Sequence, residues 1–347
     1  MRKTFYLLFI ILLCSHDLYI KLDAYFLQPN QEATLSLYNG TFEKSENTIA
    51  PDRMLDASVV ANGKRMAIDS NQWKNQDSTI TQLPFNTGEA GTYVVGVSTK
   101  ARNIELTAEK FNSYLEHDGV LDMLEKRKKD SLLDTDAVES YEKHVKAIYQ
   151  VGETRTADWS TVLGYPIEFI PQVNPYEKYS GETLEVQLLL DGKTLPNQLV
   201  FADFLKGAHA HTHNGDGDEH EVDGEKHSHG HTHSDDENSH SHESEKDETH
   251  THTNGQQLRT DEQGMFTVNL PEDGIYFLRT IHMTSVTDSD ELTHRSKWAT
   301  LTFEVSHKHG SDTHTHDDDH KDIPTWVFVL GSLLVIGLLF LIFRKGK

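Results

Sequence analysis

The sequence predicts a mainly β protein: two immunoglobulin-like β-sandwich domains with a helical insert, a disordered His-rich loop and a C-terminal transmembrane helix. Three observations support this fold class. Short runs of alternating apolar and polar residues are separated by Gly, Pro and Asn over most of the chain. The period becomes helical between residues 105 and 152, and residues 207–255 contain almost no apolar side chains. With 347 residues, the chain is long enough for two domains.

These changes of pattern give the expected boundaries. They are a signal peptide at 1–15, a first sandwich at 16–104, a helical segment at 105–152, a second sandwich at 153–306 interrupted by the loop 207–255, a His- and Asp-rich linker at 307–322, a transmembrane helix at 323–343 and a cytoplasmic tail at 344–347.

The first sandwich is predicted from alternation and one hairpin. Apolar residues alternate from Leu18 to Phe26, and the chain returns in a second strand at Ala33–Tyr38. Further strands are expected at Ser58–Ala61 and Gly91–Thr99. The pair at residues 62–63, Asn-Gly, favours a type I′ turn, which joins two antiparallel strands directly.

The helical segment is predicted from two groups of apolar residues with helical spacing. The first group is Phe111, Tyr114 and Leu115, and the second is Val138, Tyr141, Val145 and Ile148. Gly152 would end the second helix. The basic cluster at residues 126–129 is expected to be a solvated connection between the helices, with contact to anionic lipid as the alternative.

The second sandwich is predicted from short apolar or alternating runs on both sides of the His-rich loop. These runs are Gly181–Lys193, Thr260–Val268, Gly274–Arg279 and Trp298–Val305. The loop is then an insertion between two strands, and a fold tolerates such an insertion because closure entropy grows slowly with loop length.

Both ends of the chain indicate an extracytoplasmic protein. Arg2 and Lys3 precede an apolar run at residues 5–13, as in a secretory signal peptide, with cleavage expected after Ser15. Cys14, the only cysteine, could instead carry a lipid, but removal after Ser15 would leave no cysteine and exclude disulfides. Residues 323–343 carry no charge and are long enough to cross a bilayer, and basic residues at 344–347 place the tail in the cytoplasm.

The long His segment (residues 207–255) is the main functional signal. It contains 12 of the 22 histidines of the chain, and the short His segment (residues 307–320) contains five more. Neutral imidazole is a common metal ligand, and two histidines separated by one residue lie on the same side of an extended chain. The long segment also has 13 acidic and two basic residues, which give −11 of the net charge of −23 and attract cations.

The sequence therefore predicts loosely defined sites for a divalent transition metal. The candidate ligands are His209, His211, His213, His227, His229, His231, His233, His240, His242, His250 and His252 in the long segment, with His282 and His294 as weaker candidates outside it. Two other interpretations remain: an acidic linker whose histidines are incidental, and a pH-responsive segment.

His16 is a further candidate ligand. If cleavage follows Ser15, this residue offers both an α-amine and an imidazole to one cation. If cleavage occurs elsewhere, His16 only precedes the first strand.

Several blocks together resemble a known family. They are Glu139–Gly152, Gly164–Pro171, Asn174–Tyr176, Gly181–Val186, Asp191–Lys193 and Thr260–Val268, with the His-Asp pair at 16–17. In these blocks the chain is similar to the bacterial periplasmic, nickel-uptake-associated domain-of-unknown-function family, or NikM/NikK-like family. The resemblance spans about residues 16–305 and implies association with a nickel or cobalt importer, with His16 as a ligand.

The functional prediction is a membrane-anchored, non-enzymatic protein that gathers or buffers metal for uptake. Nickel or cobalt is favoured, with zinc or copper as alternatives, and the expected partners are metal ions, an importer in the envelope and the cytoplasmic membrane. Acidity argues against nucleic acid, because phosphates would be repelled. The alternative function is a surface adhesion or scaffold protein with the His-rich loop as a spacer.

Overall fold

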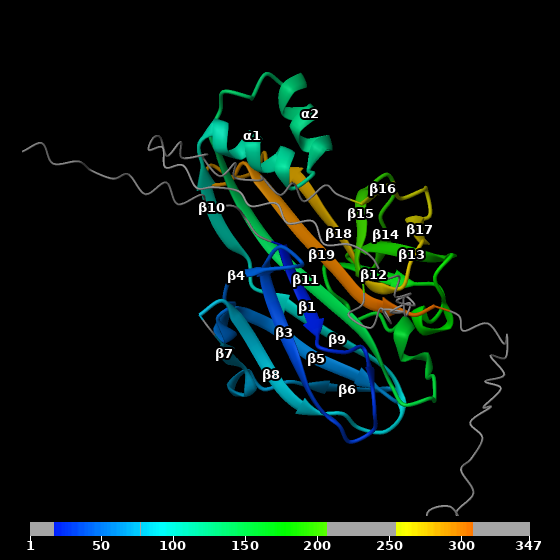
Figure 1. Ribbon diagram of the computed structural model, residues 1–347. Coiled ribbons are helices and arrows are strands. Elements are labelled where there is room, and N and C mark those ends of the chain that lie inside the picture. The colour runs from blue at the N-terminus through cyan, green and yellow to red at the C-terminus, as the bar shows by residue number, and fades with distance from the viewer. Residues whose placement is uncertain (1–16, 77, 207–254, 308–347) are drawn as a thin grey trace, which may run out of the picture. The chain divides into compact units, whose positions relative to one another are not determined.

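The computed structural model describes residues 17–76, 78–206 and 255–307. They belong to one compact unit that ends at His307. Within these residues the chain forms three β-sheets and two α-helices (Figure 1). The prediction of a mainly β protein is confirmed.

The largest sheet has ten strands and includes strands from both predicted sandwiches. Along the sheet the order is β16 (Gln256–Arg259), β15 (Leu199–Lys206), β18 (Gly274–Ser285), β19 (His294–Val305), β11 (Ala137–Val151), β9 (Gly91–Thr99), β5 (Met54–Ala61) and β6 (Lys64–Ala67). Two more strands, β10 (Arg102–Leu106) and β2 (Phe26–Leu27), pair with β11. The long strands β11 and β19 lie side by side and parallel, and they connect the two halves of the sheet (Figure 1).

Two smaller sheets complete the fold. A five-stranded sheet contains β1 (Asp17–Leu22), β3 (Glu32–Gly40), β4 (Ser45–Asn47), β7 (Lys74–Gln76) and β8 (Ile80–Asn86). A four-stranded sheet contains β12 (Ile167–Pro171), β13 (Glu182–Leu190), β14 (Lys193–Thr194) and β17 (Met265–Leu270). Short 3₁₀ turns lie at Pro51–Arg53, Ser70–Gln72, Ala157–Ser160 and Pro175–Glu177.

Several predicted strands are confirmed. The strand β9 covers Gly91–Thr99 as expected, and Asn62 and Gly63 have φ values of 50° and 72° in the turn between β5 and β6. The first predicted strand is shorter than expected: β1 ends at Leu22, and the chain turns before the two-residue strand β2.

The second predicted helix is wrong, because Ala137–Val151 forms the strand β11. This strand is central, and every residue from Lys143 to Val151 is buried. A strand covered on both faces has a nearly continuous buried run, so some of its apolar residues also match helical spacing. Gly152 therefore follows a strand, and not a helix.

The helices α1 (Ala108–His117) and α2 (Leu121–Lys129) form a separate cap at one end of the long strands (Figure 1). Phe111, Tyr114 and Leu115 are buried on α1 as predicted. The basic cluster at 126–129 is part of α2, and not a connection between helices. Arg127 is buried in this cluster and donates to the carbonyl oxygens of Leu132 and Thr135 at 2.7 and 2.6 Å.

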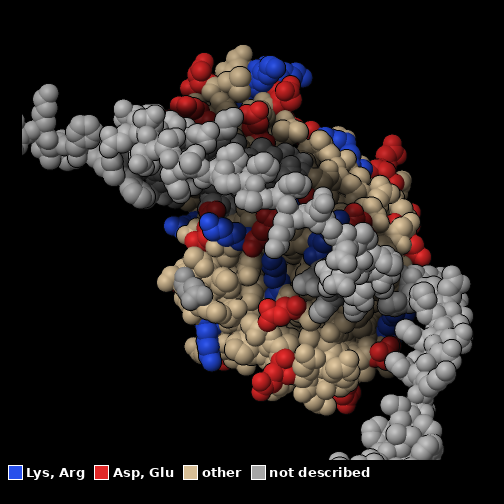
Figure 2. All heavy atoms as spheres, viewed as in Figure 1, with Lys and Arg blue, Asp and Glu red and all other residues tan. Residues whose placement is uncertain are grey.

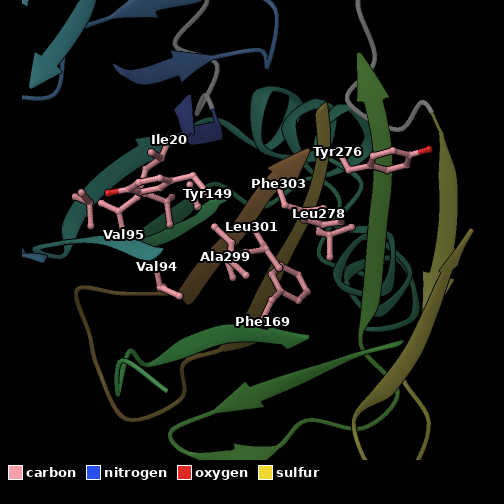
Figure 3. Close-up of a cluster of buried hydrophobic side chains, with 14 of the residues drawn as sticks. Ile20, Val94, Val95, Tyr149, Phe169, Tyr276, Leu278, Ala299, Leu301 and Phe303 are labelled. Carbon is pink, nitrogen blue, oxygen red and sulfur yellow. The ribbon is translucent and has the colours of Figure 1, made fainter. Parts of the chain in front are cut away.

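One continuous hydrophobic core lies between the sheets. Figure 3 shows side chains from all three sheets in this core, among them Ile20 of β1, Phe169 of β12 and Leu301 of β19. Two threonines of β19 also fix β1 to this core: the hydroxyl groups of Thr300 and Thr302 donate to the carbonyl oxygens of Leu18 and Ile20 at 2.8 and 2.7 Å.

Candidate functional site

The two His segments leave the folded unit at the same end of the ten-stranded sheet. The strand β15 ends at Lys206, where the long segment begins, and β19 ends at Val305, just before the short segment. Lys206 pairs with Gly274 of β18, and Gly274 pairs with Val305 of β19. The two segments therefore start two strands apart, or about 10 Å.

The long segment returns directly beside the strand that it leaves. The strand β16 pairs antiparallel with β15, in a register that runs from Leu199↔Arg259 to Ala202↔Gln256. The insertion therefore connects two neighbouring strands at the edge of the sheet.

Gly255 at the end of this insertion has a structural requirement that can be tested. Its φ is +86°, and a Cβ atom there would lie 2.4 Å from the carbonyl oxygen of Ala202. We expect Gly255→Ala to lower the free energy of unfolding in urea, through about 1–2 kcal/mol of left-handed backbone strain and about 1–3 kcal/mol of steric overlap.

Gly192→Ala is the matched control, because Gly192 has φ +74° with no atom within 4 Å of an added Cβ. Its cost should be limited to the backbone contribution. Equal losses in both variants would show that the chain does not approach β15 closely at residue 255.

Most of the predicted metal ligands lie outside the described residues. These are His16, His209, His211, His213, His227, His229, His231, His233, His240, His242, His250 and His252. Over residues 17–76, 78–206 and 255–307, the fold brings together no group of three or more His, Asp or Glu side chains that could hold a metal ion.

The predicted ligand His282 lies half-buried on β18. Its Nδ1 atom is 2.9 Å from Gln198 Oε1, and its register partner on β19 is Lys297. Burial lowers the pKa of His282, and the charge of Lys297 lowers it further, which favours the neutral ring. The neighbouring carboxylate, Asp191, is ion-paired with Lys297 at 2.8 Å.

The other described histidines on the strands and helices contact neighbouring side chains or backbone atoms of the fold. His294 is buried against the Phe111 ring, with a centroid distance of 4.7 Å, and its Nδ1 atom is 2.7 Å from Thr293 Oγ1. His144 is buried on β11, where its Nδ1 atom is 2.9 Å from Ser98 Oγ. His117 on α1 is partly exposed, and its Nδ1 atom is 2.7 Å from the carbonyl oxygen of Ser113.

Sequence reasoning missed a group of buried charges at the start of β1, which we call the Asp17 cluster: Asp17, Asp118, Glu139, Lys143 and Arg279. All five are at most 5% exposed. Arg279 is ion-paired with Asp17 at 3.3 Å and donates to the carbonyl oxygen of Asp118 at 3.0 and 2.6 Å. The cluster joins β1, β11, β18 and the turn after α1.

Glu139 and Lys143 have perturbed pKa values in this cluster. Burial raises the pKa of Glu139 to about 7, against the effect of hydrogen bonds from Ser296 and Tyr114. Burial likewise lowers the pKa of Lys143 to about 8, although the charge of Asp17 partly offsets it. The Lys143 ammonium donates to Asn39 Oδ1 at 3.1 Å. Both charges are therefore held in the interior at some expense of stability.

The surface and helices give two further findings. On the face shown in Figure 2, the acidic and basic side chains are interspersed among uncharged residues. Among the described helices, none is long and apolar enough to span a bilayer. The predicted span at 323–343 lies outside the described residues.

The fold defines a mainly β class with several packed sheets and a small helical cap. The family described as "Domain of unknown function (DUF4198)" matches residues 13–284, and the chain belongs to this family. The domain-of-unknown-function part of the predicted resemblance is therefore confirmed, whereas the description of the family names no metal.

Comparisons with individual proteins add little. A search of curated proteins found no match. The similar solved structures include the D0-D1 domain of intimin, with 9% identity, coverage of 83% of this chain and 97% of that chain, and a TM-score of 0.17. They also include the Yersinia pseudotuberculosis adhesin InvE, with 11% identity, coverage of 83% and 58%, and a TM-score of 0.17. Similarities at these TM-scores carry no functional argument.

Proposed function

We propose that this protein is an extracytoplasmic, membrane-anchored and non-catalytic protein that captures divalent transition-metal ions for uptake. The two His segments collect the ions, and the folded unit holds the segments outside the membrane. Nickel and cobalt are the favoured ions because of the family resemblance, and zinc and copper are alternatives because imidazole binds them strongly.

The observation that supports this proposal most directly is that the two His segments start at the same end of the ten-stranded sheet. Lys206 and Val305 lie at the same end of the sheet, each paired with Gly274. Two ligand-rich segments that start about 10 Å apart have a high effective concentration with respect to each other, so an ion held by one is readily shared with the other. The 13 acidic residues of the long segment raise the local cation concentration further.

Metal titration of the full chain tests this function. Protein in detergent is stripped with a chelator and titrated with Ni²⁺ and Zn²⁺ at about pH 7.5 and about pH 5.5. We expect several ions per chain at the higher pH and much weaker binding at the lower pH, because protonated imidazole cannot ligate and its usual pKa is about 6.5.

The control variants separate imidazole from charge. Replacing the histidines of the long segment by Asn retains every acidic residue, and it should remove most of the bound metal. A second variant replaces the acidic residues by Gln or Asn and retains the histidines, and it should bind a similar number of ions more weakly. If the variant without histidines in the long segment holds as many ions as the wild type, these histidines are not the ligands and the spacer interpretation is favoured.

A further inference from the structure

Glu139 has an unused hydrogen-bond acceptor in the interior. The side chain is 1% exposed, and its Oε1 atom accepts hydrogen bonds from Tyr114 and Ser296. Its Oε2 atom is also buried and has no hydrogen-bond partner among the described residues. An unpaired buried carboxylate oxygen is costly, so this atom is suited to receive a donor.

The charges around Glu139 favour a cationic donor. Among the members of the Asp17 cluster, the three carboxylates face two cations, Lys143 and Arg279. Arg279 is already engaged by Asp17 and by the carbonyl oxygen of Asp118. A carboxylate forms its strongest hydrogen bonds with charged donors, so a cation is the favoured partner of Glu139 Oε2.

The direction of β1 shows where such a charge can come from. Thr300 bonds to Leu18 and Thr302 bonds to Ile20. Both strands therefore advance in the same direction, and β1 runs parallel to β19. The start of β1 is therefore directed toward the end of β19 that carries Ser296, and Ser296 donates to Glu139. Asp17 itself is only 2% exposed, so β1 begins in the interior.

We propose that Glu139 Oε2 is the acceptor for a primary ammonium group, and that this group is the α-ammonium of the chain itself. It forms when water cleaves the peptide bond between Ser15 and His16, which leaves a carboxylate on Ser15 and an ammonium on His16. Residue 16 is bonded to Asp17, with about 3.8 Å between their Cα atoms, so the group is tethered beside the cluster. Removal of the leader then stabilises the fold.

This inference goes beyond metal capture and rests only on the expected processing after Ser15. It also differs from chelation by the N-terminus, because an α-amine held as an ammonium has no lone pair for a metal. The two roles of the amine can therefore be separated by experiment.

The test compares two chains that both extend to Lys347, and both are measured in the presence of a chelator. One starts at His16, released from an N-terminal fusion without extra residues, and the other carries Gly-Ser before His16. We expect the His16 chain to unfold about 2–6 °C higher, because only it forms the charged hydrogen bond. In this chain the α-amine should also react with an acylating reagent at least about tenfold more slowly than in Glu139→Gln.

Glu105→Gln is the matched control, because Glu105 is exposed on β10 and pairs with Val138, next to Glu139. Glu105→Gln should change neither the acylation rate of the α-amine nor the difference in unfolding temperature between the two chains. Glu139→Gln should abolish that difference. The Gly-Ser chain retains every residue of the cluster, so the comparison does not depend on the folding of a substituted protein.

Two results would overturn the proposal. One is that the α-amine of the His16 chain is acylated at the same rate with the natural Glu139 as in the Glu139→Gln variant. The other is protection of the amine that appears only when Ni²⁺ is added and persists in Glu139→Gln, which would identify the amine as a metal ligand. Neither result bears on metal binding by the His segments, which the titration above measures separately.

Discussion

Replacement of Glu168 by alanine should lower the free energy of unfolding by about 3–5 kcal/mol, because it leaves a charge unpaired in the interior. Glu168 on β12 and Lys146 on β11 form an ion pair of 3.1 Å, and both side chains are 1% exposed. Burial lowers the pKa of Lys146, and the charge and the hydrogen bond of Glu168 act in the opposite direction.

Glu168 also closes the turn that precedes its strand. Its carboxylate accepts hydrogen bonds from the backbone nitrogens of Leu163, Gly164 and Tyr165 at 3.0, 2.9 and 3.2 Å. Alanine would leave these three donors without their acceptor, and the Lys146 ammonium would keep only the carbonyl oxygens of Thr161 and Phe169. The loss should be measured by urea unfolding.

Two comparisons make this prediction specific. Asp122→Ala removes an ion pair of similar length, 2.8 Å to Arg259, but Asp122 is 60% exposed, so it should change the free energy of unfolding by no more than about 1 kcal/mol. The double variant Lys146→Met with Glu168→Gln removes both charges, and it should recover part of the loss. Equal effects of Glu168→Ala and Asp122→Ala would contradict a buried role for this pair.

The β5–β6 hairpin and the fully buried strand β9 could be predicted, because a turn signal marks the first and a short apolar run bounded by glycine marks the second. Asn62 and Gly63 adopt the positive φ values that their turn requires, and β9 lies where the apolar run predicts it. The short helix α1 was also predicted, since Phe111, Tyr114 and Leu115 form its buried face.

The central strand β11 could not be predicted from its own pattern. Alternation is lost when both faces of a strand are buried, and the remaining apolar residues then fit either period. The decisive contacts are with β19 and β9, and β19 is far away in sequence. The fold also buries Lys143, His144 and Lys146, which lie between the apolar residues of this strand.

The His segments and the Asp17 cluster also differ in how far the sequence alone can predict them. The His segments are evident from composition alone, because each carries its histidines within one continuous stretch. The Asp17 cluster has no such spacing, since Asp17, Glu139 and Arg279 come from three distant strands. The pairing of β11, β18 and β19 brings Glu139 and Arg279 together, and the bonds from Thr300 and Thr302 to β1 add Asp17.

His294 should make the protein less stable in acid, and the change can be assigned to this one residue. Burial, with a smaller effect of the charges of Arg127 and Lys126, lowers the pKa of His294 to about 4. An unfolded histidine has a pKa of about 6.5, so between about pH 6.5 and pH 4 the unfolded chain binds a proton that the folded chain does not. Stability therefore falls as the pH decreases through this window, by about 3 kcal/mol in total.

Glu139 contributes the opposite slope over nearly the same range. While Oε2 has no cationic partner, its pKa of about 7 in the folded protein lies above the value of about 4.3 for an unfolded glutamate, so the folded chain binds the extra proton. The free-energy cost of burying the charged Glu139 side chain therefore decreases as the pH falls from about 7 towards about 4.3. The wild-type profile combines both contributions, and a single-residue substitution is needed to separate them.

The variant His294→Phe retains the aromatic packing on Phe111 and removes the titrating ring. Loss of the contact with Thr293 Oγ1 should lower the free energy of unfolding of the variant by the same amount at every pH. We expect the difference in free energy of unfolding between His294→Phe and wild type to shift by about 3 kcal/mol in favour of the variant from about pH 7.5 to about pH 4. His117→Phe is the control, because His117 lies at a more exposed position on α1, the helix against which His294 packs. A difference that stays constant with pH, measured by urea unfolding at each pH, would show that His294 does not remain neutral in the folded protein.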